Sequence, residues 1–355
     1  MKKIGIIGAG PAGLSAAIEL SKIFDVTVFE QSNIGENIIC AEGFFDYFGT
    51  IDVDLPNSFQ INKLIVRSKE LYEIPLPTKG RFYTFDRKKW QKDLANQAEK
   101  KGVKILEKHK VNKDDIKSLS KGFDFLIDAT GIKSLSHFLF PEKDVKEYRK
   151  NLMPTLQYKI ESLPFAYYNA IKVVLYDNPP GYFWIFPKKR EGGIYNANVG
   201  LGFLSKSSPF PNLKKLLIKT IQEEDISINE LSLKTMSSPI PTKRLKTYRV
   251  NNIFLLGDAL GLCSPLHGGG IDTAYLSGIY LSKAIMSNDF SIFERFLKEL
   301  DKRFFLERIF VYLWEKYGSH KILSRLKNKG LFTDSPENIP LTGKWFLKAF
   351  VRLII

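Results

Sequence analysis

A glycine-rich turn close to the N-terminus constrains the fold of this chain more than any other feature. The sequence GIIGAGPAGLSAAIEL carries Gly8, Gly10 and Gly13 in G-x-G-x-x-G spacing. The apolar segment 3–7 before the turn predicts a β-strand, and the alanine-rich segment 12–22 after it predicts a helix. This order is typical of a βαβ unit, so we expect a parallel sheet covered by helices.

Each glycine of the motif has a physical role. Gly8 permits the tight turn, Gly10 lets the backbone approach a pyrophosphate, and Gly13 lets the helix pack closely on the strand. The helix start adds N–H groups and a partial positive charge for phosphates. Glu30 ends the next predicted strand, 26–30, where its carboxylate would accept hydrogen bonds from a ribose. The pattern therefore predicts FAD or NAD rather than NADP.

A second signature far along the chain favours FAD. The apolar segment IFLLGDA ends in Gly257 and Asp258, as in flavoprotein hydroxylase-like folds, where the aspartate would bind the ribityl chain. Gly268, Gly269 and Gly270 then open a predicted helix, and their N–H groups could stabilise negative charge on a reduced flavin ring. The alternative is a strand and a buried helix joined by a flexible loop.

The rest of the chain predicts two lobes and a helical end. We expect an α/β (α+β) fold with a Rossmann-like FAD-binding domain, an antiparallel-sheet substrate lobe and a helical C-terminal region. The 355 residues, 44% of them hydrophobic, are sufficient for more than one core. The predicted boundaries are residues 1–150 and 245–287 for the FAD-binding domain, 151–244 for the substrate lobe and 288–355 for the C-terminal region.

The segment PPGYFWIFPKK raises a question about the substrate lobe. In an extended strand Tyr182, Trp184 and Phe186 share one face, whereas Phe183 and Ile185 share the other. A strand that is apolar on both faces is normally buried in a core. The alternative is that one face forms a wall for a long apolar ligand.

Charge and cysteine content bear on partners and compartment. The net charge of +15 would attract anionic lipid, an acidic protein or nucleic acid, although a solvated lysine-rich surface explains it equally well. Two cysteines and no apolar run of membrane-spanning length suggest a cytoplasmic protein, for which peripheral binding to a membrane stays open. The basic amphipathic segment 342–355, with Trp345 and Phe350, could lie in a membrane interface or pack on the domain. We expect no metal site and no nucleic-acid partner.

Several motifs in one order resemble a known family. GAGPAGLSAA, CAEG, DR, DATG, PPGYFWIFPK and GDALGLCSPLHGGGI, between about residues 2 and 284, are similar to the geranylgeranyl reductase family of FAD enzymes. This family belongs to the p-hydroxybenzoate hydroxylase-like group. The most specific motif is P-x-x-Y-x-W-x-F-P-K, which begins here at Pro179. The resemblance implies reduction of isolated C=C bonds in prenyl chains, including those of archaeal ether lipids.

The resemblance also assigns residues. Arg87 at a predicted helix start corresponds to the arginine placed against FAD, and Val111 is expected at the end of the strand that follows that helix. By position the family's FAD contacts fall on Ala12, Glu30, Cys40, Ala41, Gly43, Arg87, Val111, Asp258, Gly270 and Ile271. With the glycine motifs and their neighbours, the predicted cofactor site also includes Gly8, Gly10, Pro11, Gly13, Gln31, Gly131, Gly257, Gly268 and Gly269.

The implied reaction needs a hydride, a proton and an apolar pocket. Tyr182, Trp184, Phe186 and Pro187 are the predicted substrate contacts, with Lys188 at the rim near a lipid headgroup. An isolated alkene also needs a proton at its second carbon. The candidate proton donors are His267 and Cys40. Alternatively, His267 is a histidine bonded to backbone, and Cys40 is a small buried apolar residue.

The two cysteines and the electron supply complete the expectations. Cys40 and Cys263 both fall in cofactor motifs, so we predict that they approach each other as a redox-sensitive pair. No second G-x-G-x-x-G unit is evident, so NAD(P)H or a ferredoxin would dock transiently. The alternatives are a flavin-dependent monooxygenase or halogenase of the same fold and a non-catalytic lipid-binding flavoprotein.

Overall fold

The chain forms two compact units. The computed structural model describes residues 1–46, 55–76, 82–160, 169–189, 195–226 and 234–330. Unit 1 comprises residues 1–38, 87–152 and 240–302, and unit 2 comprises residues 39–86, 153–239 and 303–355. Among the described residues, no helix is both long enough and apolar enough to cross a membrane.

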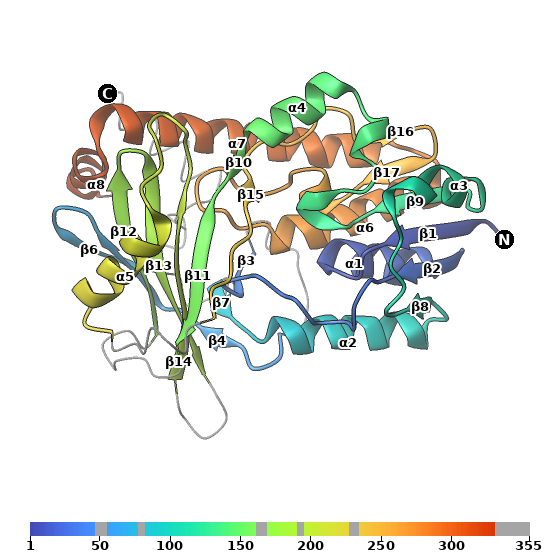
Figure 1. The fold of residues 1–355 in the computed structure, drawn as a ribbon, viewed down its shortest axis with the longest axis horizontal. Coiled ribbons are helices and arrows are strands. Elements are labelled where there is room, and N and C mark those ends of the chain that lie inside the picture. Colours follow the sequence, from blue (N-terminus) through green and yellow to red (C-terminus); the bar gives the residue numbers. More distant parts are fainter. Residues whose placement is uncertain (47–54, 77–81, 161–168, 190–194, 227–233, 331–355) are drawn as a thin grey trace. The chain divides into compact units, whose positions relative to one another are not determined.

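Unit 1 contains a six-stranded sheet that is parallel apart from one edge strand (Figure 1). Its centre is β1, which pairs in parallel with β2 on one side and with β9 on the other. The predicted opening strand and the first crossover are therefore confirmed. In spatial order the strands are β16 (Arg249–Val250), β17 (Ile253–Leu255), β9 (Phe125–Asp128), β1 (Lys3–Ile7), β2 (Asp25–Phe29) and β8 (Lys104–Leu106).

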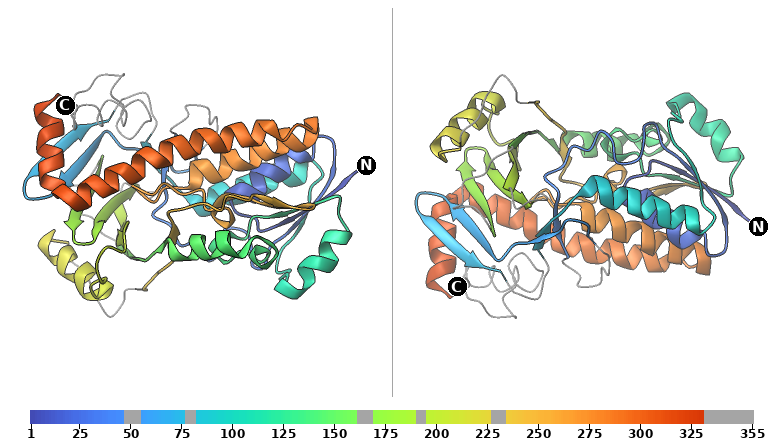
Figure 2. Two further views of the ribbon diagram at one scale, coloured as in Figure 1. Left: turned by 90° about the horizontal axis from the view of Figure 1, so that it is seen from above. Right: turned by 90° about the horizontal axis from the view of Figure 1, so that it is seen from below.

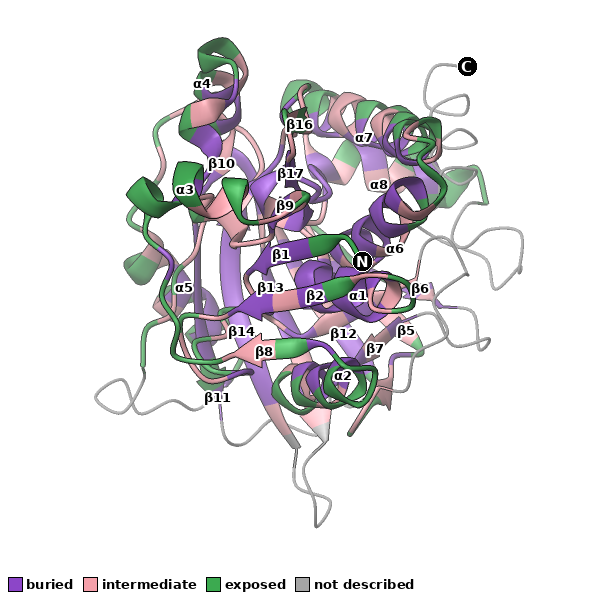
Figure 3. Ribbon diagram, turned by 90° about the vertical axis from the view of Figure 1, so that its right-hand side faces the viewer, coloured by how far each residue is buried: buried purple, intermediate pink, exposed green. Residues whose placement is uncertain are grey.

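The helices of unit 1 pack through small residues. Helices α1 and α6 lie side by side (Figure 2), and the Ser15 hydroxyl of α1 donates a 2.8 Å hydrogen bond to the carbonyl of Tyr275 in α6. Figure 3 shows α2 with exposed residues on one side and buried ones on the other; Trp90 and Leu94 are among the buried residues. The helices are α1 (Pro11–Leu20), α2 (Arg87–Lys100), α3 (Ile116–Lys121), α4 (Glu142–Lys150) and α6 (Ile271–Ser287).

Unit 2 is built on a six-stranded mixed sheet (Figure 1). Antiparallel pairing joins most of its strands, but β12 and β5 run parallel. In spatial order the strands are β11 (Thr155–Ile160), β14 (Tyr195–Phe203), β13 (Pro180–Lys189), β12 (Ala170–Asp177), β5 (Lys63–Arg67) and β6 (Leu71–Pro75). A smaller sheet contains β3 (Gly43–Phe45), β7 (Phe82–Thr84) and β4 (Phe59–Gln60), and the helices α5 (Leu213–Glu223) and α8 (Ser319–Asn328) complete the unit.

Three elements remain. Helix α7 (Ser291–Tyr317) begins in the sequence of unit 1 and ends in that of unit 2. The two-residue strands β10 (Leu152–Met153) and β15 (Ile240–Pro241) lie where the chain passes between units. Residues 331–355, including Trp345 and Phe350 of the predicted amphipathic segment, lie outside the described residues.

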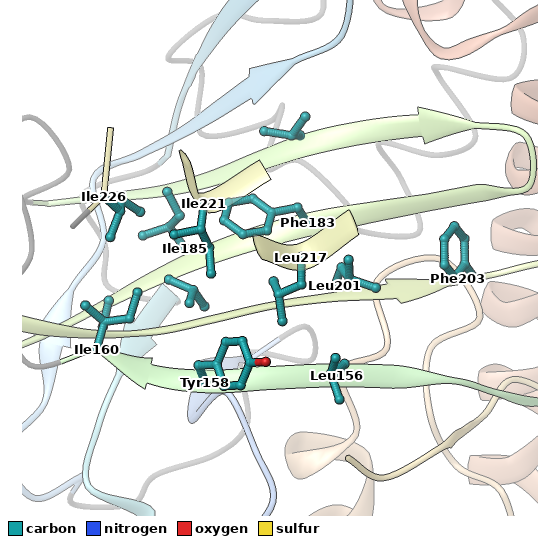
Figure 4. Close-up of a cluster of buried hydrophobic side chains, with 13 residues drawn as sticks. Leu156, Tyr158, Ile160, Phe183, Ile185, Leu201, Phe203, Leu217, Ile221 and Ile226 are labelled. Carbon is teal, nitrogen blue, oxygen red and sulfur yellow. The ribbon is translucent and has the colours of Figure 1, made fainter. Parts of the chain in front are cut away.

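The core of unit 2 answers half of the question raised by the aromatic strand. Phe183 and Ile185 of β13 are fully buried and pack with Leu217 and Ile221 of α5 (Figure 4). These apolar residues recur at the helical spacing that buries one side of α5. The Phe183 face of β13 is therefore an ordinary core face.

The division of the chain differs from the predicted boundaries chiefly in two respects. Residues 288–302 fall in unit 1 and residues 303–355 in unit 2 rather than in a separate C-terminal region, and residues 39–86 change domain. Residues 39–86 belong to unit 2, although the sequence placed them in the FAD-binding domain. The reason is long-range pairing, because β5 aligns in parallel with β12 from Ala170↔Lys63 to Val174↔Arg67. No local sequence pattern predicts a pairing between strands that are about a hundred residues apart in the chain.

Candidate functional site

The glycine turn of unit 1 has the geometry that the motif predicts. Gly8 has φ +100°, and an added Cβ there would lie 2.5 Å from the carbonyl oxygen of Ala129. A Cβ on Gly13 would collide with the carbonyl oxygen of Gly8. Gly10 is different, since no atom outside its chain neighbours would lie within 4 Å of a Cβ at that position. Side chains are thus excluded at Gly8 and Gly13, whereas the turn is open at Gly10.

The helix start beside this opening suits a phosphate. Helix α1 begins at Pro11 with Gly10 as its N-cap, and no described side chain caps it. Helix N-termini of this kind bind anions through their N–H groups and the helix dipole. The residues present therefore fit the pyrophosphate of a dinucleotide.

Glu30 is held in position by the turn itself. Its Oε2 accepts the Ala9 N–H at 2.9 Å, and its Oε1 accepts the N–H and hydroxyl of Ser32, both at 3.0 Å. Among the described residues, Oε2 accepts only the Ala9 N–H, so it can accept a further hydrogen bond, as a ribose hydroxyl would require. Gln31 follows directly. Val111 is buried, but it lies in a loop rather than at a strand end, because β8 stops at Leu106.

A chain of side-chain hydrogen bonds links α2 to the glycine turn. Arg87 is the first residue of α2, and its Nε donates to Oε1 of Gln91 at 2.9 Å. The Gln91 amide donates in turn to the carbonyl of Ala9 at 3.2 Å. Gln91 is buried and orients both the arginine and the turn, a role that the helical pattern of the sequence did not reveal.

Asp258 lies beside the N-terminus of α6. The Cys263 thiol donates to Oδ1 of Asp258 at 3.1 Å. A Cβ on Gly270, the N-cap of α6, would lie 2.5 Å from the Cys263 sulfur and 3.5 Å from the same carboxylate oxygen. No described side chain caps α6, so Gly270 and Ile271 present a second anion-binding helix start next to a carboxylate.

Two buried residues that the sequence did not single out support the Asp258 turn. The Tyr148 hydroxyl donates to the carbonyl of Asp258, and the His137 Nε2 donates to the carbonyl of Ala259, each at 2.7 Å. Burial lowers the pKa of His137 and raises that of Tyr148. Both side chains therefore stay neutral near neutral pH, and they position the turn without adding charge.

The remaining predicted residues of unit 1 occupy turns. Gly131 has φ +77°, with no other atom within 4 Å of a Cβ built there. Gly268 has φ +64°. Gly269 donates its N–H to Nδ1 of His267 at 3.1 Å, so this histidine is bonded to backbone, as its alternative reading held.

Unit 2 brings together two motifs that are far apart in the sequence. The segment 40–43 packs against β13 and β14. The indole of Trp184 donates to Oδ1 of Asn198 at 2.8 Å, and the Asn198 amide donates to the carbonyl of Cys40 at 3.4 Å. A Cβ on Gly43 would collide with the ring of Phe186. Ala41 lies between these contacts in the same short loop.

The second face of β13 is aromatic and backed by glycines. Tyr182 and Trp184 have ring centroids 5.9 Å apart, and their cross-strand partners in β14 are Gly202 and Gly200. A side chain on Gly200 would collide with the Trp184 ring. Tyr182 and Phe186 are only partly buried, unlike Phe183 on the core face. This face can therefore offer aromatic surface to a ligand.

The predicted rim position of Lys188 is wrong. Its ammonium forms an ion pair with Glu42, and the two side chains are only 16% and 8% exposed. The strand ends at Lys189, one residue beyond Pro187 and Lys188, which were expected to close it. The Lys188 charge is thus enclosed beside the aromatic face.

Three comparisons place the chain among known proteins. Residues 6–38 match the NAD(P)-binding Rossmann-like domain family. A digeranylgeranylglycerophospholipid reductase of Methanosphaera stadtmanae is 30% identical over 81% of this chain and 78% of its own length. The chain belongs to the digeranylgeranylglycerophospholipid reductase family. A second reductase of that name, from Methanocaldococcus jannaschii, is 27% identical over 92% of this chain and 88% of its own.

A solved structure confirms the fold of this family member. A geranylgeranyl bacteriochlorophyll reductase-like protein from Thermoplasma acidophilum superposes with a TM-score of 0.74 at 21% identity, over 99% of this chain and 96% of its own. The predicted family and fold class are both confirmed. FAD, the predicted cofactor, fits the open Gly10 turn and the two uncapped helix starts of unit 1.

The two cysteines of this reductase family member lie in different units. Cys40 is partly buried in unit 2 and Cys263 is buried in unit 1, and both are thiols in the structure. Their predicted approach as a redox-sensitive pair stays a prediction.

Asp258 gives a prediction about stability and pH. Burial raises its pKa, while the Cys263 hydrogen bond and the charge of Arg87 oppose that shift. A raised folded-state pKa means that stability falls as pH rises through it, because the native state binds more protons than the unfolded state. We expect Asp258→Asn to stabilise the FAD-free protein at neutral pH while weakening FAD binding.

Thermal melts of the FAD-free wild type and Asp258→Asn between about pH 4 and about pH 8 measure this effect. The gain in melting temperature should shrink as the pH falls into the range where Asp258 is protonated. A gain that is the same at every pH would contradict a cost of burying the charged carboxylate.

Proposed function

We propose that this chain is an FAD-dependent reductase that saturates isolated C=C bonds of geranylgeranyl chains in archaeal membrane lipids or their precursors. Membership of a family of named reductases supports an oxidoreductase that acts on CH–CH groups. The observation that carries the proposal is the contact between the 40–43 loop, a predicted flavin-binding motif, and the aromatic face of β13. A cofactor loop and an apolar wall in contact are what reduction of a prenyl chain requires.

The residues have distinct tasks in this proposal. Gly10 and the start of α1 hold the pyrophosphate of FAD, Glu30 holds a ribose and Asp258 holds the ribityl chain. The N–H groups at the start of α6 would favour negative charge on the flavin ring. FAD supplies the hydride for the alkene when it is bound and reduced.

The aromatic face binds the prenyl chain and excludes water. Each CH₂ group buried there contributes about 0.8 kcal/mol, so a long isoprenoid gains much of its affinity from Tyr182, Trp184 and Phe186. Pro187 extends this surface. The sequence named His267 and Cys40 as candidate proton donors, and NAD(P)H or a ferredoxin is the proposed electron donor.

Peripheral association with a membrane is part of the proposal, with the protein in the cytoplasm. Phe305, Tyr312 and Tyr317 of α7 are 58%, 59% and 47% exposed. The ammonium groups of Lys316 and Lys321 lie 5.2 Å and 5.4 Å from the centre of the Tyr317 ring. Aromatic residues among lysines suit the interface of an anionic bilayer, where a lipid substrate resides.

An anaerobic conversion assay tests the proposed function. The FAD-loaded protein is reduced with dithionite, mixed with digeranylgeranylglycerol phospholipid and analysed by mass spectrometry. Each saturated bond should add the mass of two hydrogen atoms. A product that gains oxygen in air would indicate a monooxygenase, and bound but unchanged lipid would indicate a non-catalytic flavoprotein; either result contradicts the proposal.

A further inference from the structure

A buried ion pair lies at one end of the aromatic face of unit 2. Residues 182, 184, 186 and 188 of β13 alternate onto one face of the strand, and the pairing with β14 runs without interruption from Gly181↔Phe203 to Lys189↔Tyr195. Lys188 is therefore the next residue on the face formed by Tyr182, Trp184 and Phe186. Its ammonium pairs with Glu42 and is largely enclosed.

Glu42 is held in an unusual conformation. Its φ of +60° lies in the left-handed region, which costs a residue with a side chain on the order of 1 kcal/mol. Its N–H donates to the Cys40 sulfur at 3.2 Å, and its carbonyl accepts the Phe85 N–H at 3.2 Å. These contacts fix the backbone so that the carboxylate meets Lys188.

Stability alone does not account for such a pair. Burying two charges costs about as much as their attraction returns, so apolar residues in their place are often as stabilising or more so. The pair also lies next to surface that the proposed function assigns to the substrate, since Phe186 packs on Gly43 in the Glu42 loop. A buried charge at this position is better explained by a role in the reaction than by a contribution to stability.

We propose that Lys188 is the proton donor for alkene reduction, with Glu42 and the Cys40 loop as the groups that hold it in place. This inference rests on the proposed function. A hydride forms one new C–H bond with one alkene carbon. The π electron pair of the alkene takes a proton from the Lys188 ammonium to form the second C–H bond. Lys188 is left as a neutral amine, and a proton from solvent restores it.

The surroundings of Lys188 suit this role. Burial lowers its pKa to about 8, and the neighbouring Cys40 opposes that shift. Glu42 and Cys40, both from one loop, are titratable groups beside the ammonium, and the Thr84 hydroxyl of β7 donates to the carbonyl of Pro187. Burial favours release of the Lys188 proton, whereas the Glu42 carboxylate keeps the ammonium charged until the proton is transferred.

Two substitutions at position 188 separate proton donation from positioning. Lys188→Arg keeps a positive charge for Glu42 but cannot release a proton near neutral pH. Lys188→Met combined with Glu42→Met removes both charges and leaves no unpaired carboxylate. In anaerobic single turnover we expect both variants to re-oxidise reduced flavin with geranylgeranyl lipid at least roughly 100-fold more slowly, within the range of general acid catalysis. FAD content and reduction by dithionite should stay unchanged in Lys188→Arg.

A matched control lies on the other face of the same sheet. Lys172 of β12 forms an ion pair with Glu224, and these side chains are 13% and 2% exposed. Lys172 is paired with Ile185, a core residue, so it lies away from the aromatic face. Lys172→Arg should therefore leave the single-turnover rate near that of the wild type. Wild-type rates in Lys188→Arg would overturn the proposal and leave only a positioning role.

A second readout does not depend on activity or on FAD. Alkylation of Cys40 by iodoacetamide in the FAD-free protein can be followed by peptide mass spectrometry, which distinguishes it from Cys263. The Lys188 ammonium lies close to Cys40, so the double methionine variant should differ from the wild type several-fold in its alkylation rate at neutral pH, with the difference changing as Lys188 loses its charge above about pH 8. Equal rates at every pH would contradict a titrating ammonium beside Cys40.

These readouts distinguish the failure of this inference from the failure of the proposed function. If the wild type reduces no geranylgeranyl lipid, the proposed function fails. There is then no alkene reduction to which Lys188 could donate a proton, even if the alkylation profile is as expected. If the wild type reduces the lipid and Lys188→Arg does so equally well, only the inference about Lys188 fails.

Discussion

Gly13→Ala is expected to abolish FAD binding by disrupting the turn that holds the pyrophosphate. The new Cβ would collide with the carbonyl oxygen of Gly8, a backbone atom that cannot rotate away. Gly8 is itself fixed by the hydrogen bond from its N–H to the carbonyl of Phe29 at 2.8 Å, and the Ala129 carbonyl leaves no room for a side chain there. Overpacking of this kind costs about 3 kcal/mol, so we expect a lower melting temperature as well as loss of the flavin.

Gly10→Ala is the matched control, because it adds the same methyl group three residues earlier. Gly10 has an ordinary φ of −78° and no other atom within 4 Å of the new Cβ. The FAD-free variant should melt like the wild type but bind FAD roughly 10- to 100-fold more weakly, since the methyl group occupies the space of the pyrophosphate. Isothermal titration with FAD and thermal melts measure both effects. Equal loss of stability in the two variants would contradict the assignment of Gly10 to ligand contact.

The two faces of β13 should respond differently to the same truncation. Phe183→Ala removes a fully buried ring from the core with α5 and should cost about 3–5 kcal/mol of unfolding free energy. Tyr182→Ala removes a partly buried ring from the opposite face and should cost much less stability. Because Tyr182 is assigned to the prenyl chain, its loss should raise KM for the lipid roughly tenfold.

Urea unfolding and steady-state kinetics on the two variants provide the comparison. A stability loss in Tyr182→Ala as large as that in Phe183→Ala, with KM unchanged, would mean that both faces of β13 are core. Sequence alternation alone left these two readings open. The burial of Phe183 and Ile185 against α5 settles only the first face.

The sequence predicted the nucleotide-binding elements well because their signals are local. Strand β1 runs from Lys3 to Ile7 as expected, and α2 begins at Arg87 and buries Trp90 and Leu94. Glycine spacing and helical periodicity determine these features within a few neighbouring residues. Helix α1 ends at Leu20 rather than residue 22, a difference confined to its last turn.

The parts that sequence reasoning missed depend on contacts between distant segments. Gln91 bonds Ala9, and Asn198 bonds Cys40, across separations of 82 and 158 residues. Glu42 belongs to the CAEG motif, yet no local sequence pattern predicts its pairing with Lys188 on a strand about 150 residues later. Polar residues that support a site have no periodicity of their own, so only the fold identifies them.

The most direct test of the account is re-oxidation of the reduced flavin without oxygen. Absorbance of the dithionite-reduced, FAD-loaded protein, freed of excess dithionite, should stay constant under anaerobic conditions until geranylgeranyl lipid is added. The oxidised spectrum should then return with one FAD oxidised for each C=C bond saturated. A flavin that stays reduced with the lipid present, and is oxidised only when oxygen enters, would contradict a reductase.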